Sequence, residues 1–148
     1  MPSYPSSKSY MSVRYTVAST AQTGLHYMFD TTNYGGTTAV ISENTITYNA
    51  TTGRFAVPEK GVYAINLVAY FVQSGAGTLG AFRLENSDAT TLWLASPTIH
   101  NSVDPAGTPA MFIVELAANE WVRWSADSNT TFTLTSTIGT TMNIWKID

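Results

Sequence analysis

The sequence predicts an all-β protein built as an antiparallel two-sheet sandwich. Short apolar runs recur along the whole chain with Gly, Pro, Asn and Asp between them, which is typical of antiparallel strands joined by turns. No run of useful length has a helical period. Residues 112–119 come closest, but they contain Ile113 and Val114, which favour a strand. About ten strands of this kind form a sandwich, a jelly roll or a barrel.

The chain divides into an arm and one domain. Residues 1–10 hold two prolines, four serines and two tyrosines, which predicts an extended N-terminal arm. Residues 11–148 have the size of a single domain with a real core. The predicted strands of that domain are residues 11–18, 25–29, 37–41, 45–48, 54–57, 62–73, 79–85, 91–95, 110–117, 121–126, 131–135 and 141–147.

The most informative strand is residues 62–72, because both of its faces are apolar. Asn66 is its one polar side chain. Its two faces are Tyr63, Ile65, Leu67, Ala69 and Phe71 on one side and Val62, Ala64, Val68, Tyr70 and Val72 on the other. A strand of a lone antiparallel sandwich buries one face and leaves the other in water. We therefore expect a second covering layer, most simply another subunit.

The late strands repeat this two-sided pattern. Trp121 alternates with Val122 and Trp124, and Trp145 stands opposite Met142 and Ile144. Each Trp taken singly is explained by core packing, because buried indoles contribute large apolar area. For the set of Val62, Tyr70, Trp121 and Trp145, we expect at least one to lie at a subunit contact.

Composition excludes several functions. Only 11% of the residues are charged, against about 25% in an ordinary domain, and the net charge is −3. Seven scattered basic residues do not form a nucleic-acid-binding face. Without cysteine there is no disulfide framework and no thiol catalysis. No signal peptide and no apolar run of membrane-spanning length is visible, so we expect a product assembled in the cytoplasm with no membrane span.

No group of residues indicates catalysis. His26 and His100 are isolated, and an isolated histidine is most often a packed or surface residue. The acids Asp30, Asp88, Asp104 and Asp127 are scattered through predicted turns, where capping of the backbone explains them. The glycines at 35, 36, 75 and 77 are hairpin or loop glycines, because no helix follows them to form a phosphate site. We expect no enzyme and no cofactor.

Residues 48–67 resemble the globular heads of complement C1q and their tumour-necrosis-factor-like relatives. The resemblance rests on an aromatic, a Phe and a Gly-x-Tyr at the family's spacing: Tyr48, Phe55, Gly61 and Tyr63. The segment Leu-Ala-Ala-Asn-Glu-Trp-Val at 116–122 is similar to the family's Leu-x-x-Gly-Asp-x-Val turn, with Asn and Glu in place of Gly and Asp. Residues 65 and 67 depart from the pattern, since Ile and Leu replace aromatics.

This resemblance implies a ten-stranded jelly roll that assembles as a homotrimer and acts as a binding or display module. Some relatives bind calcium through loop carboxylates, but no Asp-x-Asp cluster occurs here, so calcium is left open as the less favoured alternative. Without a collagen-like stalk, the head itself would have to form the trimer.

Two functions follow. The first is a structural or display protein on a particle, such as a virion decoration protein, fibre head or spike, assembled in the cytoplasm. Its arm, with Tyr4 and Tyr10, would dock onto a neighbouring capsid or particle protein. The second is a secreted recognition module that binds a surface carbohydrate or a protein receptor through its loops. The expected exposed loops are residues 73–78, 86–90 and 97–108.

Overall fold

A computed structural model describes residues 9–73, 79–87, 91–95, 106–134 and 140–148, which form eleven strands and one short helix. The strands in chain order are β1 (Tyr10–Val17), β2 (Gln22–Tyr27), β3 (Thr37–Asn44), β4 (Thr47–Asn49), β5 (Arg54–Ala56), β6 (Gly61–Gln73), β7 (Leu79–Asn86), β8 (Thr91–Ala95), β9 (Ala106–Leu116), β10 (Trp121–Leu134) and β11 (Thr141–Lys146), and helix α1 spans Thr31–Tyr34. All strand pairs are antiparallel.

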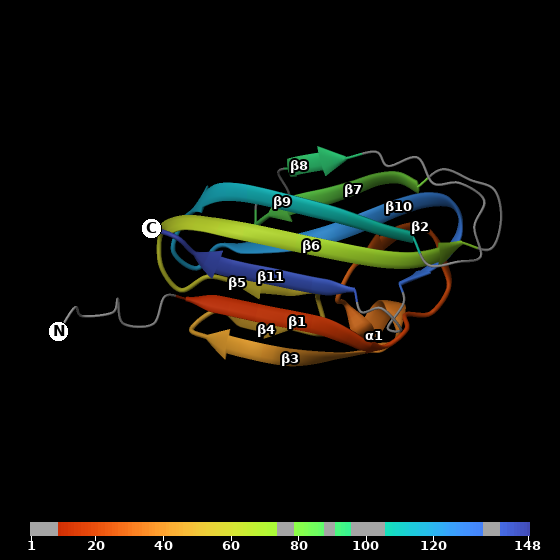
Figure 1. Cartoon of the computed structure of the whole chain (residues 1–148), viewed down its shortest axis with the longest axis horizontal. Helices are drawn as coiled ribbons and strands as arrows, with labels where there is room; N and C mark the ends of the chain where they lie inside the picture. The colour runs from red at the N-terminus through yellow and green to blue at the C-terminus, as the bar shows by residue number, and fades with distance from the viewer. Residues whose placement is uncertain (1–8, 74–78, 88–90, 96–105, 135–139) are drawn as a thin grey trace.

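The strands form two packed layers. The first layer runs β3-β1-β11-β6-β9, and the second runs β4-β5-β10-β7-β8 with β2 also paired to β10. In Figure 1 the strands β1, β11 and β6 cross in front of β4, β5 and β10. The layers are joined at one end, where Phe71 of β6 pairs with Leu134 of β10. The predicted all-β, two-sheet antiparallel jelly roll is therefore confirmed.

The core lies between the layers and is built from alternate residues of the strands. In β6, Tyr63, Ile65 and Leu67 are buried, and in β10 the buried set includes Val122 and Trp124. Burial of each such side chain stabilises the fold by roughly 1.5–3 kcal/mol. The indole N–H of Trp124 donates to the sulfur of Met142 at 2.9 Å, so the one polar group of this ring is satisfied inside the core.

The residues that carry the family resemblance build one corner of this core. The ring of Tyr48 stacks on Phe55 with centroids 4.9 Å apart, and Phe55 meets the edge of Phe29 at 5.7 Å. The hydroxyl of Tyr48 donates to the carbonyl of Phe29. Tyr63 crosses the core and donates to the carbonyl of Glu59 at 2.7 Å. The spacing of these aromatic residues is therefore explained by packing in the core and does not indicate a ligand.

At two positions in this region the backbone of another segment passes so close that only glycine fits. Gly53 has φ of 73°, and a Cβ there would lie 2.6 Å from the carbonyl oxygen of Met28. At Gly61 a Cβ would lie 2.7 Å from the carbonyl oxygen of Asp148, because the C-terminus passes beside the start of β6. Real Cβ atoms do not approach so closely, so each turn predicted from a glycine has a steric reason.

Two local features differ from the sequence prediction. The runs 121–126 and 131–135 form one strand, β10. Its pairing with β7 ends at Ser128, and its later part pairs with β2 across a register shift between Ser128 and Phe132 and with β6 from Phe132 on. The helix α1 is a single turn, too short for periodicity to reveal. It begins where the carboxylate of Asp30 accepts a hydrogen bond from the amide of Asn33 at 2.9 Å, so the capping role predicted for Asp30 is confirmed.

Candidate subunit interface

The face of the first layer that points away from the core, here called the outer face, carries a patch of apolar side chains. In the strand register, Ala64 of β6 lies opposite Trp145 of β11 on one side and Ile113 of β9 on the other. Tyr10 of β1 lies next in the same row. Asn66 lies opposite Met111. Met111 and Ile113 are each 60% exposed and Tyr10 is 40% exposed, which is high for side chains of this kind.

The two faces of β6 differ as the alternation of its sequence requires. Tyr63, Ile65, Leu67 and Ala69 are buried in the core. On the outer face Ala64 is covered by its neighbours, but Val62, Val68 and Tyr70 are half-buried. The side chains of Phe71 and Val72 lie outside the described part of the structure. Within its described part, β6 therefore has one face buried in the core and a second, largely apolar face on which Val62, Val68 and Tyr70 stay partly exposed.

Of the four residues predicted for a subunit contact, the fold brings three onto this face. Val62 and Tyr70 share the outward register of β6, and Trp145 of β11 lies opposite Ala64 on the same face. Trp121 lies elsewhere, at the start of β10 in the second layer, where its ring contacts the guanidinium of Arg54. The set predicted from the sequence is thus split between the two layers.

Met111 and Ile113 were missed as candidates, although a signal for them exists. In residues 111–116, Met111, Ile113 and Glu115 alternate with Phe112, Val114 and Leu116, and the second set points into the core. The alternation could have marked the first set as outward-facing. The sequence alone could not place these residues next to Ala64 and Trp145, because that neighbourhood depends on which strands pair.

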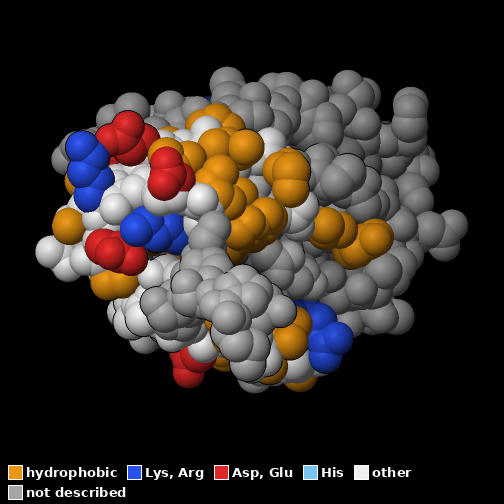
Figure 2. All heavy atoms as spheres, turned by 60° about the vertical axis from the view of Figure 1, so that its left-hand side comes forward, with side chains coloured by type: hydrophobic (Ala, Val, Ile, Leu, Met, Phe, Trp, Pro, Cys, Tyr) orange, Lys and Arg blue, Asp and Glu red, His pale blue; other side chains and the backbone are white. Residues whose placement is uncertain are grey.

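Charged residues lie to one side of the apolar patch. Lys60 pairs with Glu115 and Lys146 with Glu59, each with a nitrogen–oxygen distance of 3.2 Å. Figure 2 shows hydrophobic side chains gathered in one area of the surface and charged side chains of both signs grouped beside it. Exposed pairs of this kind contribute little to stability. An apolar area with polar and charged residues at its border is typical of a protein–protein interface.

The arm begins at the rim of the outer face. The carbonyl of Ser9 accepts a hydrogen bond from the amide of Lys146 at 2.8 Å, and its hydroxyl accepts one from Thr45. These contacts tie the root of the arm to the ends of β11 and β3. Tyr10, the first residue of β1, lies next to Trp145. Tyr4, the other tyrosine predicted to dock the arm, lies outside the described residues.

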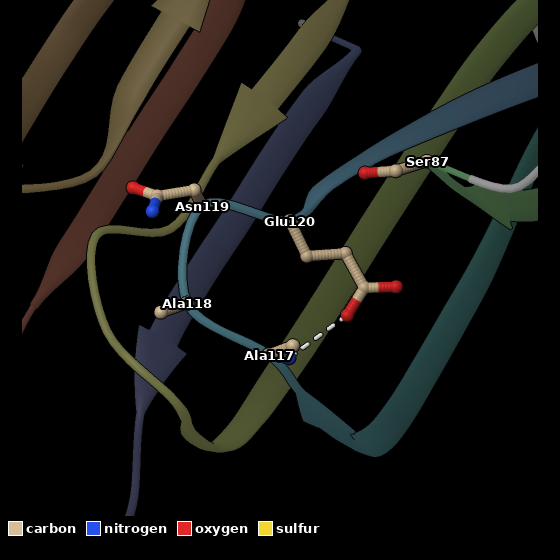
Figure 3. A pocket seen from close by; sticks show the side chains of 5 residues that line it. All are labelled: Ser87, Ala117, Ala118, Asn119 and Glu120. Atoms are coloured by element: carbon tan, nitrogen blue, oxygen red, sulfur yellow. Dashed lines mark hydrogen bonds between the residues drawn. The ribbon is translucent and has the colours of Figure 1, made fainter.

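A shallow hollow lies beside the turn between β9 and β10. Its lining is Ser87, Ala117, Ala118, Asn119 and Glu120. Figure 3 shows the carboxylate of Glu120 folded back to accept the amide hydrogen of Ala117, at 2.8 Å. The Ser87 hydroxyl accepts a hydrogen bond from the backbone amide of Trp121. Asn119 has φ of 65°, a left-handed conformation that explains why the resembling family has glycine at this position.

The described residues hold no group of acids and histidines that could bind a metal ion. His26 is fully buried and stacks on Tyr34, with ring centroids 4.5 Å apart. Burial lowers the pKa of His26 from 6.5 to about 4, against a smaller opposing effect of Asp30. Of the two alternatives predicted for it, a packed or a surface residue, His26 is therefore a packed residue. Asp127 lies within β10 and not in a turn, while His100, Asp88 and Asp104 lie outside the described residues.

No protein-family model matches the sequence, and no curated protein matches it. Solved structures do match the fold. The structure of Eiger TNF from S. frugiperda superposes with a TM-score of 0.64 at 13% identity, covering 95% of this chain and 94% of that chain. The crystal structure of murine APRIL at pH 5.0 superposes with a TM-score of 0.66 at 11% identity, covering 95% of this chain and 100% of that chain. The globular domain of the zebrafish complement 1qA protein superposes with a TM-score of 0.62 at 17% identity, covering 95% of this chain and 98% of that chain.

These likenesses define the class of protein by its architecture: the chain has the C1q/TNF-like jelly-roll fold over nearly its whole length. The resemblance seen in residues 48–67 is confirmed at the level of the fold. Within the described residues, no helix has both the length and the apolar character needed to cross a membrane.

Proposed function

We propose that this protein is a non-enzymatic homotrimeric display module on the surface of a particle, with the virion of a phage or virus as the favoured particle. In the trimer the outer face of each subunit packs against its neighbours around a threefold axis. The observation that carries the proposal is the exposure of Met111 and Ile113, each 60%, on β9 at the edge of the first layer, beside the outward-facing residues of β6. Monomeric proteins rarely leave such a patch in water.

The position of the other outer-face residues supports a trimer. Val62, Tyr70 and Trp145 are half-buried in the single chain and would lose their remaining exposure against a partner. Closure around an axis also covers the edge of β9, which among the described strands pairs with β6 alone. Matching solved structures include TNF-type and complement globular domains, which agree with a binding or display module.

The particle hypothesis is supported by the arm. Its root at Ser9 is fixed by hydrogen bonds to β11 and β3, next to the rim of the outer face. Ser9, the first described residue, is therefore attached to the domain beside the outer face. In a trimer the three arms would start close to the subunit contacts, in a position to tie the head to another particle protein, with Tyr4 and Tyr10 as the apolar anchors.

The particle hypothesis is tested by mass spectrometry of purified virions or particles from the source, combined with truncation. The protein should be present in stoichiometric amounts, and removal of residues 1–8 should release it from particles while the isolated protein stays trimeric. Absence from purified particles, or unchanged attachment after the truncation, would contradict the hypothesis.

The second candidate is a secreted recognition module that binds carbohydrate or protein through its loops. It is supported by the likeness to the zebrafish complement globular domain and by the hollow at the β9–β10 turn, which combines hydroxyl, amide and carboxylate groups. Fractionation separates the two candidates. A secreted recognition module would be found free in the culture medium, and a display module would sediment with the particles.

A further inference from the structure

Arg54 differs from every other basic residue that the structure describes. Lys60, Lys146 and Arg123 form ion pairs. Arg14 and Arg83 are exposed to solvent, and Lys8 lies outside the described residues. Arg54 is half-buried, and no described carboxylate forms an ion pair with it. Partial burial of a cation without an anion costs free energy, so this arrangement calls for an explanation.

The guanidinium of Arg54 is held in a fixed place. Its central carbon lies 4.2 Å from the centroid of the Trp121 ring, a distance that indicates stacking on the ring face. Its Nε atom is buried and donates to no acceptor within the described part of the chain, and the same is true of the hydroxyl of Thr52. Because Nε is buried, a ligand would meet the terminal Nη groups of Arg54, for which the described residues form no ion pair.

Arg123, on the same face of the second layer, also stacks on an aromatic ring, but it is paired with an anion. Its guanidinium lies 3.5 Å from the centroid of the Tyr27 ring. Its Nε and Nη2 atoms both donate to one carboxylate oxygen of Glu85, at 3.0 and 2.8 Å, with side chains only 13% and 15% exposed. Arg54 has the same kind of aromatic support, but the matching carboxylate is not provided by the described residues.

We propose that Arg54, stacked on Trp121, binds the single carboxylate of an acidic saccharide. The site carries one unneutralised cation, since Glu85 neutralises Arg123. Glu120, next to Trp121 in the chain, adds negative charge that would repel a second acidic group. These charges favour a ligand with one carboxylate over a polyanion such as a nucleic acid or a sulfated chain.

The groups around Trp121 fit the hydroxyls of a saccharide. The hollow of Figure 3 lies at the turn that leads into Trp121, and its Ser87 hydroxyl is bonded to the Trp121 amide. Ser87, Asn119 and Glu120 offer donors and acceptors of the kind that bind sugar hydroxyls. This inference rests on the proposed display role, because it supplies the recognition that such a head would perform. The site lies on the second layer, away from the outer face, so it does not depend on the trimer contact.

The test is a ligand-observed NMR titration of the full chain with four probes: 3′-sialyllactose, lactose, N-acetylglycine and a heparin hexasaccharide. The acidic trisaccharide should bind at least about tenfold more tightly than each of the other three. Arg54→Gln should weaken that binding by about tenfold or more, since it removes a charge-assisted hydrogen bond. The matched control Arg83→Gln removes an exposed arginine and should leave the affinity unchanged.

A second variant separates binding from packing. Arg54→Met keeps the apolar contact with Trp121 and removes the half-buried charge, so it should abolish binding while Tm stays unchanged or rises. Binding should persist in the Ile113→Asp variant whether or not that variant is monomeric, so failure of the sugar site and failure of the trimer are distinguishable. Equal binding of lactose, equal binding of N-acetylglycine, tighter binding of heparin, or full binding by Arg54→Gln would each overturn the proposal.

Discussion

Ile113 and Trp145 lie on opposite sides of Ala64 on the outer face, one on β9 and the other on β11. The small Ala64 side chain is only 3% exposed, although it points away from the core. Ile113 itself remains 60% exposed. The row of side chains therefore forms an apolar surface with a shallow centre and raised flanks, a shape that a neighbouring subunit can fill.

A charge placed in this surface should break the trimer. Ile113→Asp would bury an unpaired carboxylate at the contact, at a cost of several kcal/mol per subunit. We expect a folded monomer at micromolar concentration, measured by light scattering on a sizing column. Leu25→Asp is the matched control, since Leu25 is 43% exposed but lies on β2 in the second layer. If the trimer persisted in Ile113→Asp but was lost in Leu25→Asp, the subunit contact would lie on the second layer, which would contradict the proposed interface.

Stability should fall as the pH is lowered through the range in which His26 titrates. The pKa of His26 is about 4 in the folded state and 6.5 in the unfolded state, so the unfolded chain binds the proton first. Stability from this group is complete above about pH 6.5, declines towards pH 4 and is then lost, by up to about 3 kcal/mol. Urea unfolding at several pH values measures the decline.

The two histidines of the chain provide the control for this experiment. His26→Gln should flatten the decline between pH 6.5 and pH 4, and His100→Gln should leave it as it is. A decline of the same size in both variants would mean that other groups, such as buried carboxylates, are responsible.

The hydroxyl of Tyr15 should matter for folding although it lies far from any surface. It accepts a hydrogen bond from the amide of Phe29 at 2.7 Å, and Phe29 has φ of 67°, an uncommon value for a bulky residue. Tyr15→Phe leaves that buried amide without its acceptor, so we expect a loss of about 1–3 kcal/mol in chemical denaturation. Tyr10→Phe, at an exposed tyrosine, should change stability by less than about 0.5 kcal/mol. Equal effects of the two substitutions would show that the buried hydrogen bond contributes nothing.

The turn at Asn119 should accept glycine and reject a β-branched residue. With φ of 65°, Asn119→Gly removes a small steric penalty and should change the free energy of unfolding by less than about 1 kcal/mol. Asn119→Val should destabilise by about 1–3 kcal/mol, because a β-branched residue is strained in this conformation. Thermal unfolding followed by circular dichroism distinguishes them, and equal melting temperatures would refute the steric explanation.

The sequence predicted the layered fold well because its signals are local. Gly53 and Gly61 mark turns, and the alternation along β6 marks a strand with two apolar faces. It could not predict that Trp121 and Trp145 lie in different layers, since the alternation gives the two faces of each strand and not which strands share a sheet. The stacking of Arg54 on Trp121 has the same origin: these residues lie far apart in the chain and meet through the pairing of β5 with β10.

The central claim is that the outer face is a contact between copies of this chain. Multi-angle light scattering on the purified full-length protein tests it most directly. Three chains of 16.0 kDa give 3 × 16.0 = 48.0 kDa, and we expect a single species of this mass at micromolar concentration. A stable species of 16.0 kDa over the same concentration range would contradict the account.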